Sequence, residues 1–432
     1  MKKFALIGLI FIILFGTGCG YIKQKPIILT ERRETPEHTP FWHYQGWVIA
    51  RASLHNHTTF SDGCYSAEGL AQEARNEGIS VLAITDHREG RMCLGKSAKF
   101  CVNTGGVEGK QLGYEKYLEQ LQKLAKETEN PIILPGLEVA PVIWNERNSP
   151  WLLIKGESWH FVIYDISDPE VFKEMPVSKA ILMRPEKEPG AEAFNNFVNY
   201  IRDAGGLIFQ AHPQWTSQQW IASLHFKSPF PIHLTDQIPR LNGVAVIPEG
   251  FNAGAPGGKW DLGLMQYLVG YREEPFWVIG DCDFHCPPHT LRIGTTLLYL
   301  KELSGKGALD AIRAGKMIAL MGNDFQEVYV NEFSVGSNRP AEEKIMLGKE
   351  AKLSGAPLIR FSLSQEVPIK EARLIRNGKV IYTSSSSHFE YLDRFAFEKK
   401  LRAYYRVEVI GLGPMELANA NLLLTNPIFI SW

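Results

Sequence analysis

The chain has 432 residues, of which 45% are hydrophobic and 22% are charged, and its formal net charge at pH 7 is −1. This length suits two or three domains, each with a sizeable core. The near-zero charge disfavours a nucleic-acid partner, because proteins that bind nucleic acids usually carry a strongly basic surface.

The N-terminal segment has the layout of an export signal. A basic start precedes an apolar run at residues 4–15, which is shorter than the roughly 20 residues of a membrane-spanning helix. Small residues then lead to Cys19, and this ending resembles a bacterial lipoprotein signal, in which the cysteine becomes the lipidated first residue. An ordinary signal peptide and an uncleaved anchor are the alternatives. We therefore expect a signal at residues 1–19, a tether at 20–45, and a lipoprotein anchored in the periplasm or at the cell surface.

The chain has six cysteines, and an odd number remains when Cys19 is set aside for lipidation, so not all of them can pair within the chain. Cys93 and Cys101 bracket a short polar segment and are the best disulfide candidates. The others could be soft metal ligands, form a second disulfide or fill small buried spaces, and the last two roles are favoured. These others are Cys64, Cys282 and Cys286.

Short apolar runs alternate with amphipathic stretches through the middle of the chain. The runs are rich in β-branched residues and predict strands at residues 48–54, 81–85, 132–137, 207–211, 244–248 and 276–279. The amphipathic stretches predict helices at residues 66–77, 114–124, 194–201 and 262–270. Ser66 can cap the first helix and Gly78 can end it. The alternation predicts parallel strands with helices outside them, in either a barrel or an open sheet.

Metal-binding side chains follow most of the expected strands. His55 and His57 follow the first strand, and because alternate strand residues point the same way, both can bind one ion. Asp283 and His285 repeat this spacing after the last strand. Strands between these two are followed by His87, Glu138 and His212. In βα barrels the carboxyl ends of the strands form the catalytic face, so the sequence predicts a metal site there.

The ordered motifs HNH, SDG, TDH, GLE, WHF, AHP and DCDFH, within residues 48–325, resemble the PHP (polymerase and histidinol phosphatase) superfamily. This resemblance implies a metal-dependent hydrolase on a distorted seven-stranded (βα)7 barrel, whose cleft holds two or three ions. It implies a ligand set for each ion: His55, His57, Glu138 and Asp283 for the first, Asp62, His87 and His212 for the second, and Glu138, His160 and His285 for the third. His160 precedes its apolar run, so its role comes from the resemblance and not from the strand ends.

The chemistry of this ligand set indicates the metals and the reaction. Mixed histidine and carboxylate ligands suit divalent Zn, Mn or Fe better than Ca or Mg. Ions about 3.5–4 Å apart generate hydroxide near neutral pH, so we expect hydrolysis by a metal-bound hydroxide without a covalent intermediate. Asp86 and Asp281 adjoin ligands and either orient imidazole rings or cap strand ends. Arg88 could contact an anionic group of a small-molecule substrate.

The βα alternation stops near residue 331, which divides an expected barrel at residues 46–330 from a β-sandwich-like accessory domain at 331–432. Short strands are predicted at residues 357–363, 372–376, 379–382 and 403–410. Asn377 and Gly378 predict a hairpin turn between two of them. The phrases LIRNGKVI, YYRVEVIG and NPIFI resemble the carbaryl-hydrolase-like branch of the superfamily, which includes exported proteins and hydrolases of esters or carbamates.

These features together predict an exported, membrane-anchored metal-dependent hydrolase, with a phosphoesterase as the leading expectation. A carboxyl- or carbamate-ester hydrolase of the same superfamily is the first alternative. The second is a metal-dependent binding lipoprotein without catalysis, which the intact ligand set disfavours.

Overall fold

The computed structural model describes residues 41–88, 91–94, 100–103, 106–108, 113–142, 152–154, 159–177, 190–214, 217–221, 224–228, 232–338, 345–413 and 420–432. Cys19 and the expected signal peptide lie outside these residues, as does most of the expected tether. No helix in the described part of the chain is long and apolar enough to cross a membrane.

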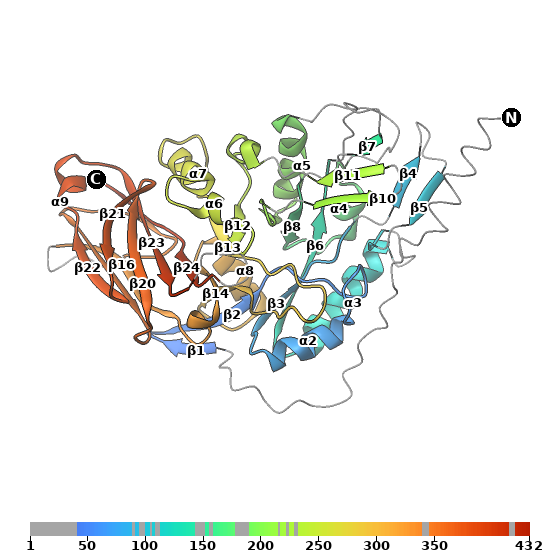
Figure 1. Cartoon of the computed structure of the whole chain (residues 1–432), viewed down its shortest axis with the longest axis horizontal. Coiled ribbons are helices and arrows are strands. Elements are labelled where there is room, and N and C mark those ends of the chain that lie inside the picture. The colour runs from blue at the N-terminus through green and yellow to red at the C-terminus, as the bar shows by residue number, and fades with distance from the viewer. Residues whose placement is uncertain are drawn as a thin grey trace.

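A 16-stranded sheet runs through the molecule (Figure 1). From one edge it begins with β13 (Trp277–Gly280), β12 (Gly243–Ile247), β9 (Leu207–Gln210), β8 (Phe161–Tyr164), β6 (Ile132–Val139), β3 (Val81–Ile84) and β2 (Trp47–Ser53). The strands expected from the apolar runs in this region are all present, and β8 comes from the apolar run after His160. Most of their residues are buried, as expected for strands that are covered on both faces.

Helices cover this part of the sheet. The expected helices are present as α2 (Ala67–Asn76), α3 (Gly113–Glu127), α5 (Ala191–Asp203) and α7 (Lys259–Leu268). Ser66 caps α2, because its hydroxyl accepts a hydrogen bond from the Gly69 N–H at 3.1 Å, and Gly78 follows the helix with a positive φ of 66°. Figure 1 shows α2 and α3 beside β3, and α3 contacts β6. Shorter helical segments are α4 (Pro169–Lys173), α6 (Phe251–Gly254), α8 (Gly305–Arg313), η1 (Ile232–Gln237) and η2 (Asn323–Phe325).

One strand runs against the direction that the alternation predicted. β2, β3 and β6 are parallel neighbours, and so are β9, β12 and β13. β8 lies between these two groups and is antiparallel to both β6 and β9. The expectation of parallel strands throughout is therefore wrong at β8, because an apolar run reports that a strand is buried but not which way it runs.

The sheet is not closed by strand pairing. β13 is one end of the strand order, and β2 pairs on its far side with β14 (Gly294–Leu300) instead of with β13. A parallel bridge between Asn56 and Phe284 joins the segments that follow β2 and β13. The α/β class is thus confirmed, whereas a closed (βα)7 barrel is not confirmed in the described residues.

The rest of the large sheet is formed mainly by C-terminal strands. β14 pairs with β15 (Met317–Met321), and the order continues through β24 (Leu422–Thr425), β23 (Ala403–Gly411), β20 (Ile369–Arg376) and β21 (Lys379–Ser384). The expected hairpin is present, since Asn377 and Gly378 join β20 to β21 with positive φ angles of 50° and 78°. One sheet therefore extends across the boundary expected near residue 331.

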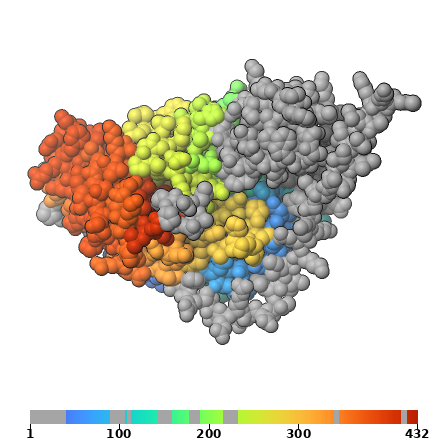
Figure 2. Space-filling view, in the orientation of Figure 1, coloured from blue at the N-terminus to red at the C-terminus, as the bar shows by residue number. Residues whose placement is uncertain are grey.

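A smaller sheet packs against these C-terminal strands. Its order is β17 (Ile345–Met346), β16 (Val330–Ser337), β19 (Pro357–Leu363) and β22 (His388–Leu392). Phe333 and Phe361 of this sheet share a buried apolar cluster with Leu374 and Val407 of the large sheet. Figure 2 shows this β-rich part, coloured orange to red, at one end of the molecule. A separate C-terminal sandwich is not confirmed, because the large sheet continues into the α/β part.

The remaining strands lie outside the main strand order of the large sheet or form small separate sheets. β1 (Phe41–Tyr44) pairs with β2, and β25 (Ile428–Ser431) pairs with β18 (Glu350–Lys352) and β23. Two small sheets consist of β4 (Arg91–Leu94) with β5 (Phe100–Asn103), and of β10 (Ser217–Ile221), β11 (Leu224–Ser228) and β7 (Leu152–Ile154). The last helix is α9 (Arg394–Glu398).

Candidate metal centre

The predicted metal ligands meet at one edge of the large sheet. His55 and His57 follow β2, His87 follows β3, Glu138 lies near the end of β6, and the other histidines and aspartates come from neighbouring segments. His160 precedes β8, and because β8 is antiparallel to its neighbours, the start of β8 lies beside the ends of β6 and β9. The direction of this strand explains a position that the strand-end pattern left unexplained.

The first group of side chains that could hold an ion contains the four residues expected for it: His55, His57, Glu138 and Asp283. The Nε2 atoms of His55 and His57 lie 3.2 and 3.3 Å from Oε2 of Glu138. They lie 3.4 and 3.1 Å from Oδ1 of Asp283. The first three side chains are fully buried, whereas 37% of the Asp283 side chain is exposed. This group therefore has a closed inner side and an open outer side.

Two further groups adjoin the first one. One contains His57, Asp62, His87 and His285, with Nε2 of His285 at 3.3 Å from Oδ1 of Asp62. The other contains His87, Glu138 and His160, with Nδ1 of each histidine at 2.7 Å from a Glu138 oxygen. Nε2 of His212 lies 3.0 Å from the same Glu138 oxygen that His160 contacts.

The expected grouping differs from the structure in the places of two histidines. His212 was expected with Asp62 and His87 but contacts Glu138, whereas His285 was expected with Glu138 but lies beside Asp62. Strand order is the reason. His212 follows β9, which pairs with β8 and so lies next to His160. The segment that carries His285 bridges the one after β2, through Asn56 and Phe284, and this brings His285 to the Asp62 loop.

The donor atoms of this site fit divalent cations. Oε2 of Glu138 is buried and lies 2.7–3.3 Å from nitrogens of His55, His57 and His87, yet no donor in the described residues makes a hydrogen bond to it. The Nε2 atoms of His55 and His57 are themselves 3.1 Å apart. Buried acceptors that converge without donors are costly unless a cation lies between them. Imidazole and carboxylate together are the ligands that Zn, Mn and Fe accept.

The two aspartates next to the ligands have different roles. Asp281 is buried, and its carboxylate accepts a hydrogen bond from Nδ1 of His55 at 2.8 Å, which leaves Nε2 of that ring facing the centre. Asp86 contacts the loop after β2 instead of a ligand ring. It accepts hydrogen bonds from the backbone N–H and hydroxyl groups of Thr58 and Ser61 at 2.7–3.0 Å. The first aspartate thus orients an imidazole, whereas the second fixes a loop.

The carboxylates shift the pKa of the histidines they face. Burial lowers the pKa of His87, but the adjoining Glu138 carboxylate outweighs this effect and raises the pKa to about 10. Burial also opposes the shift of His285, whose pKa the Asp283 and Asp62 carboxylates raise to about 9. A metal ion has to compete with protons at these rings, because only a neutral imidazole can be a ligand.

Two cysteines at the site form a disulfide. Cys64 is bonded to Cys286, 222 residues further along the chain. Cys282 is a free, buried thiol, and burial raises its pKa to about 12, which makes it a filler and not a thiolate ligand. The pairing expected between Cys93 and Cys101 stays a prediction, since their backbones are partners across β4 and β5 but their side chains lie outside the described residues.

Two more charged residues lie close to the centre. Arg88, the predicted substrate contact, forms an ion pair with Glu108 at 3.3 Å, and 14% of its side chain is exposed. Glu249 was not predicted. It follows β12, so the strand-end rule would have found it. Burial raises the pKa of the Glu249 carboxyl to about 7, although the neighbouring His212 opposes this shift. Glu249 adds a carboxyl group at the edge of the sheet where the ligands gather.

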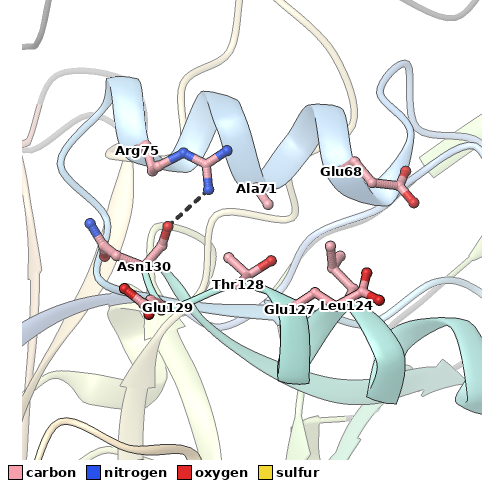
Figure 3. A pocket seen from close by; sticks show the side chains of 8 residues that line it. All are labelled: Glu68, Ala71, Arg75, Leu124, Glu127, Thr128, Glu129 and Asn130. Carbon is pink, nitrogen blue, oxygen red and sulfur yellow. Dashed lines mark hydrogen bonds between the residues drawn. The ribbon is translucent and has the colours of Figure 1, made fainter.

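A surface hollow lies away from these residues. It is bordered by α2 and by the end of α3, where Arg75 donates a hydrogen bond to the Asn130 carbonyl at 2.9 Å (Figure 3). Its other polar lining includes Glu68, Glu127 and Glu129, and none of the predicted metal ligands borders it. This hollow is therefore separate from the candidate metal centre.

Comparisons with known proteins agree with a site of a metal-dependent hydrolase. Residues 53–204 match the family model of the PHP domain, which spans the motifs from HNH to WHF but not His212, Asp283 or His285. No curated protein is significantly similar to the chain. The domain match supports the resemblance to the PHP superfamily and a metal-dependent hydrolase.

Solved structures with weak similarity have several described activities. A two-domain protein from Bacteroides vulgatus, described as containing a predicted PHP-like metal-dependent phosphoesterase, is 14% identical, with 93% of this chain and 100% of that chain covered and a TM-score of 0.41. A lesion-specific endonuclease from Pyrococcus furiosus is 13% identical over 69% of this chain and 64% of that chain, with a TM-score of 0.34. An amidohydrolase from Chromobacterium violaceum is 14% identical over 55% and 89%, with a TM-score of 0.27.

Proposed function

We propose that the protein is a metal-dependent hydrolase that cleaves phosphate esters of small molecules. The observation that carries this proposal is the position of Glu138. One of its oxygens faces His160 and His212, and the other faces His55, His57 and His87. A buried carboxylate between two sets of imidazoles is suited to bridge two cations. The match to the PHP domain supports the same class of enzyme.

The residues of the chain hold and orient the reacting groups. When bound, divalent Zn, Mn or Fe ions polarise an ester oxygen and lower the pKa of water from 15.7 toward roughly 7. Asp281 keeps the His55 ring directed at the centre, and the buried first group excludes bulk water from the inner side. Substrate reaches the open side near Asp283 and His285, whose side chains are 37% and 30% exposed. Arg88 releases Glu108 and binds an anionic group of the substrate there.

We also propose that seven strands form the distorted barrel that the superfamily resemblance implies. These strands are β2, β3, β6, β8, β9, β12 and β13. The bridge between Asn56 and Phe284 supports this arrangement, because it lies where β13 would have to meet β2. Hydrolysis of carboxyl or carbamate esters is the second candidate, favoured by the C-terminal phrases that resemble the carbaryl-hydrolase-like branch.

A substrate panel tests the reaction. The purified chain, reconstituted with Mn or Zn, is expected to hydrolyse phosphomonoesters or phosphodiesters at least tenfold faster than carboxyl or carbamate esters, measured as kcat/KM. The reverse order would replace the phosphoesterase by the second candidate. Bound metal without turnover of any ester would instead favour a binding lipoprotein.

We also propose that the chain is exported and anchored through a lipid on Cys19, as the pattern of residues 1–19 suggests. Stable anchoring needs more than one acyl chain, because a single chain binds membranes only marginally. In a bacterial host, labelled palmitate should enter the wild-type chain and should not enter the Cys19→Ser variant. Equal labelling of both chains would contradict lipidation at this residue.

A further inference from the structure

The Cys64–Cys286 disulfide connects two loops that carry predicted metal ligands. Cys64 lies two residues after Asp62, and Cys286 directly follows His285. The Cα atoms of the two cysteines are 5.3 Å apart, and the Cys64 N–H donates a hydrogen bond to the His285 carbonyl at 2.9 Å. The covalent bond thus holds the loops of Asp62 and His285 close together. The ligand atoms of these two residues lie 3.3 Å apart.

We propose that this disulfide positions Asp62 and His285 for metal binding, so that its reduction selectively empties the group formed by His57, Asp62, His87 and His285. The inference rests on the proposed metal-dependent function. It goes beyond that function by making one part of the metal centre dependent on the redox state of two cysteines.

The need for such a restraint follows from where the ligands lie. His55, His57 and Glu138 are fully buried at or next to strand ends, so the sheet and its packing hold them. Asp62 and His285 lie outside the named strands, and their side chains are 25% and 30% exposed. Less packing surrounds these two, and a covalent link between their loops restricts the positions that they can adopt.

Backbone hydrogen bonds also hold the Asp62 loop, since the Thr59 N–H donates to the Tyr65 carbonyl at 2.8 Å. Asp86 binds Thr58 and Ser61, and the Gly63 N–H donates to the Thr58 carbonyl at 3.0 Å. Gly63 packs so closely on the preceding backbone that a Cβ atom there would lie 2.2 Å from the His57 carbonyl oxygen. The Cys64 N–H bonds to the His285 carbonyl, and the disulfide adds a covalent connection between the same two loops. We infer that its loss leaves the first group intact and moves Asp62 relative to His285.

Reduction is a two-electron step. A phosphine such as TCEP attacks one sulfur, the S–S bond breaks, and water converts the phosphorus adduct to the phosphine oxide. The two cysteines take up two protons and become thiols. Cys64 is buried, whereas Cys286 is partly exposed, so the reductant reaches the bond from the Cys286 side.

The experiment compares metal content in three preparations after identical Mn reconstitution: oxidised wild type, TCEP-treated wild type and the Cys64→Ser/Cys286→Ser double variant. Elemental analysis should show about one ion per chain fewer in the second and third preparations. The dissociation constant of the lost ion should rise about 10–100-fold, as for other residues that orient ligands. TCEP should not change the metal content of the double variant.

A disulfide that closes a long loop also stabilises the whole chain, so the melting temperature is measured in parallel. The Ser66→Ala variant serves as a control that loses a helix cap and some stability but should keep its metal. Asp62→Asn should lose the same ion, and adding it to the double variant should cause no further loss. If the double variant does not fold, the TCEP-treated wild type provides the same comparison.

The outcomes separate the two proposals. Equal metal content in oxidised and reduced chains, whatever the melting temperature, would overturn the positioning role and leave the hydrolase proposal intact. Absence of bound metal in the oxidised wild type would overturn both. Loss of every ion on reduction would overturn the selective role, because the first group should survive.

Discussion

Glu138→Gln is expected to remove at least one metal ion per chain and to lower hydrolysis by orders of magnitude, while the fold survives. Glutamine keeps the shape of the side chain and removes the charge that faces imidazoles on both of its oxygens. Opposite unit charges about 4 Å apart attract by about 4 kcal/mol at an effective dielectric constant of about 20. That loss corresponds to roughly a thousandfold in affinity, and mutual repulsion between cations increases it.

A matched control separates the charge at the centre from any effect of a buried glutamate. Glu73 is also buried, with 6% exposure, but it lies on α2 and contacts Asn76. Glu73→Gln should keep the metal content and kcat/KM of the wild type. Elemental analysis, steady-state kinetics and circular dichroism are the measurements. Full metal content and near-normal turnover in Glu138→Gln would contradict the bridging assignment and the mechanism built on it.

The strand ends were predictable because the pattern behind them is local. A β-branched apolar run predicts a strand such as β3, and the residue after it, such as His87, follows at once in the sequence. Parallel strands bring such residues to one edge of a sheet. This reasoning needs no knowledge of which strands are neighbours, and it also applies to Glu249 after β12, where no histidine stands beside the carboxylate.

The features that were not predictable depend on long-range pairing. The direction of β8, which sets the place of His160, is decided by its pairing with β6 and β9. The positions of His212 beside Glu138 and of His285 beside Asp62 follow from which strand ends adjoin. The disulfide joins cysteines 222 residues apart, and spacing alone favoured a closer pair. Each of these is a property of topology, on which a local residue pattern carries no information.

The continuation of the large sheet into the C-terminal strands also depends on long-range pairing and was not predictable from local patterns. The part of the chain after residue 330 consists mainly of strands, from β16 to β25, with the short helix α9. The change of pattern near residue 331 cannot show that β15 pairs with β24, which joins both halves in one sheet. Buried polar contacts strengthen that union, since Arg406 on β23 forms a buried ion pair with Asp261 on α7 at 2.7 Å. The C-terminal strands therefore brace the part of the chain that carries the candidate metal centre.

His57→Ala is expected to have one of the two broadest effects on metal binding among the histidines of the described residues, because His57 and His87 each belong to two groups. His57 contributes to two of the groups that could hold an ion: one with His55, Glu138 and Asp283, and one with Asp62, His87 and His285. Its Nε2 lies 3.1 Å from Asp283, and its Nδ1 lies 3.7 Å from Asp62. Removing one imidazole therefore takes a ligand from both, and metal content and hydrolysis should fall together.

The matched control is a histidine that takes no part in the centre. His388 is exposed on β22, in the smaller sheet, where its ring contacts the Ser386 hydroxyl. His388→Ala should keep the metal content, the kcat/KM and the melting temperature of the wild type. In His57→Ala, elemental analysis should show the loss of at least one ion per chain, and kcat should fall at least a thousandfold. A His57→Ala chain that lost turnover but kept all of its metal would assign His57 to proton transfer or substrate contact, because removal of a ligand should release the ion that it holds.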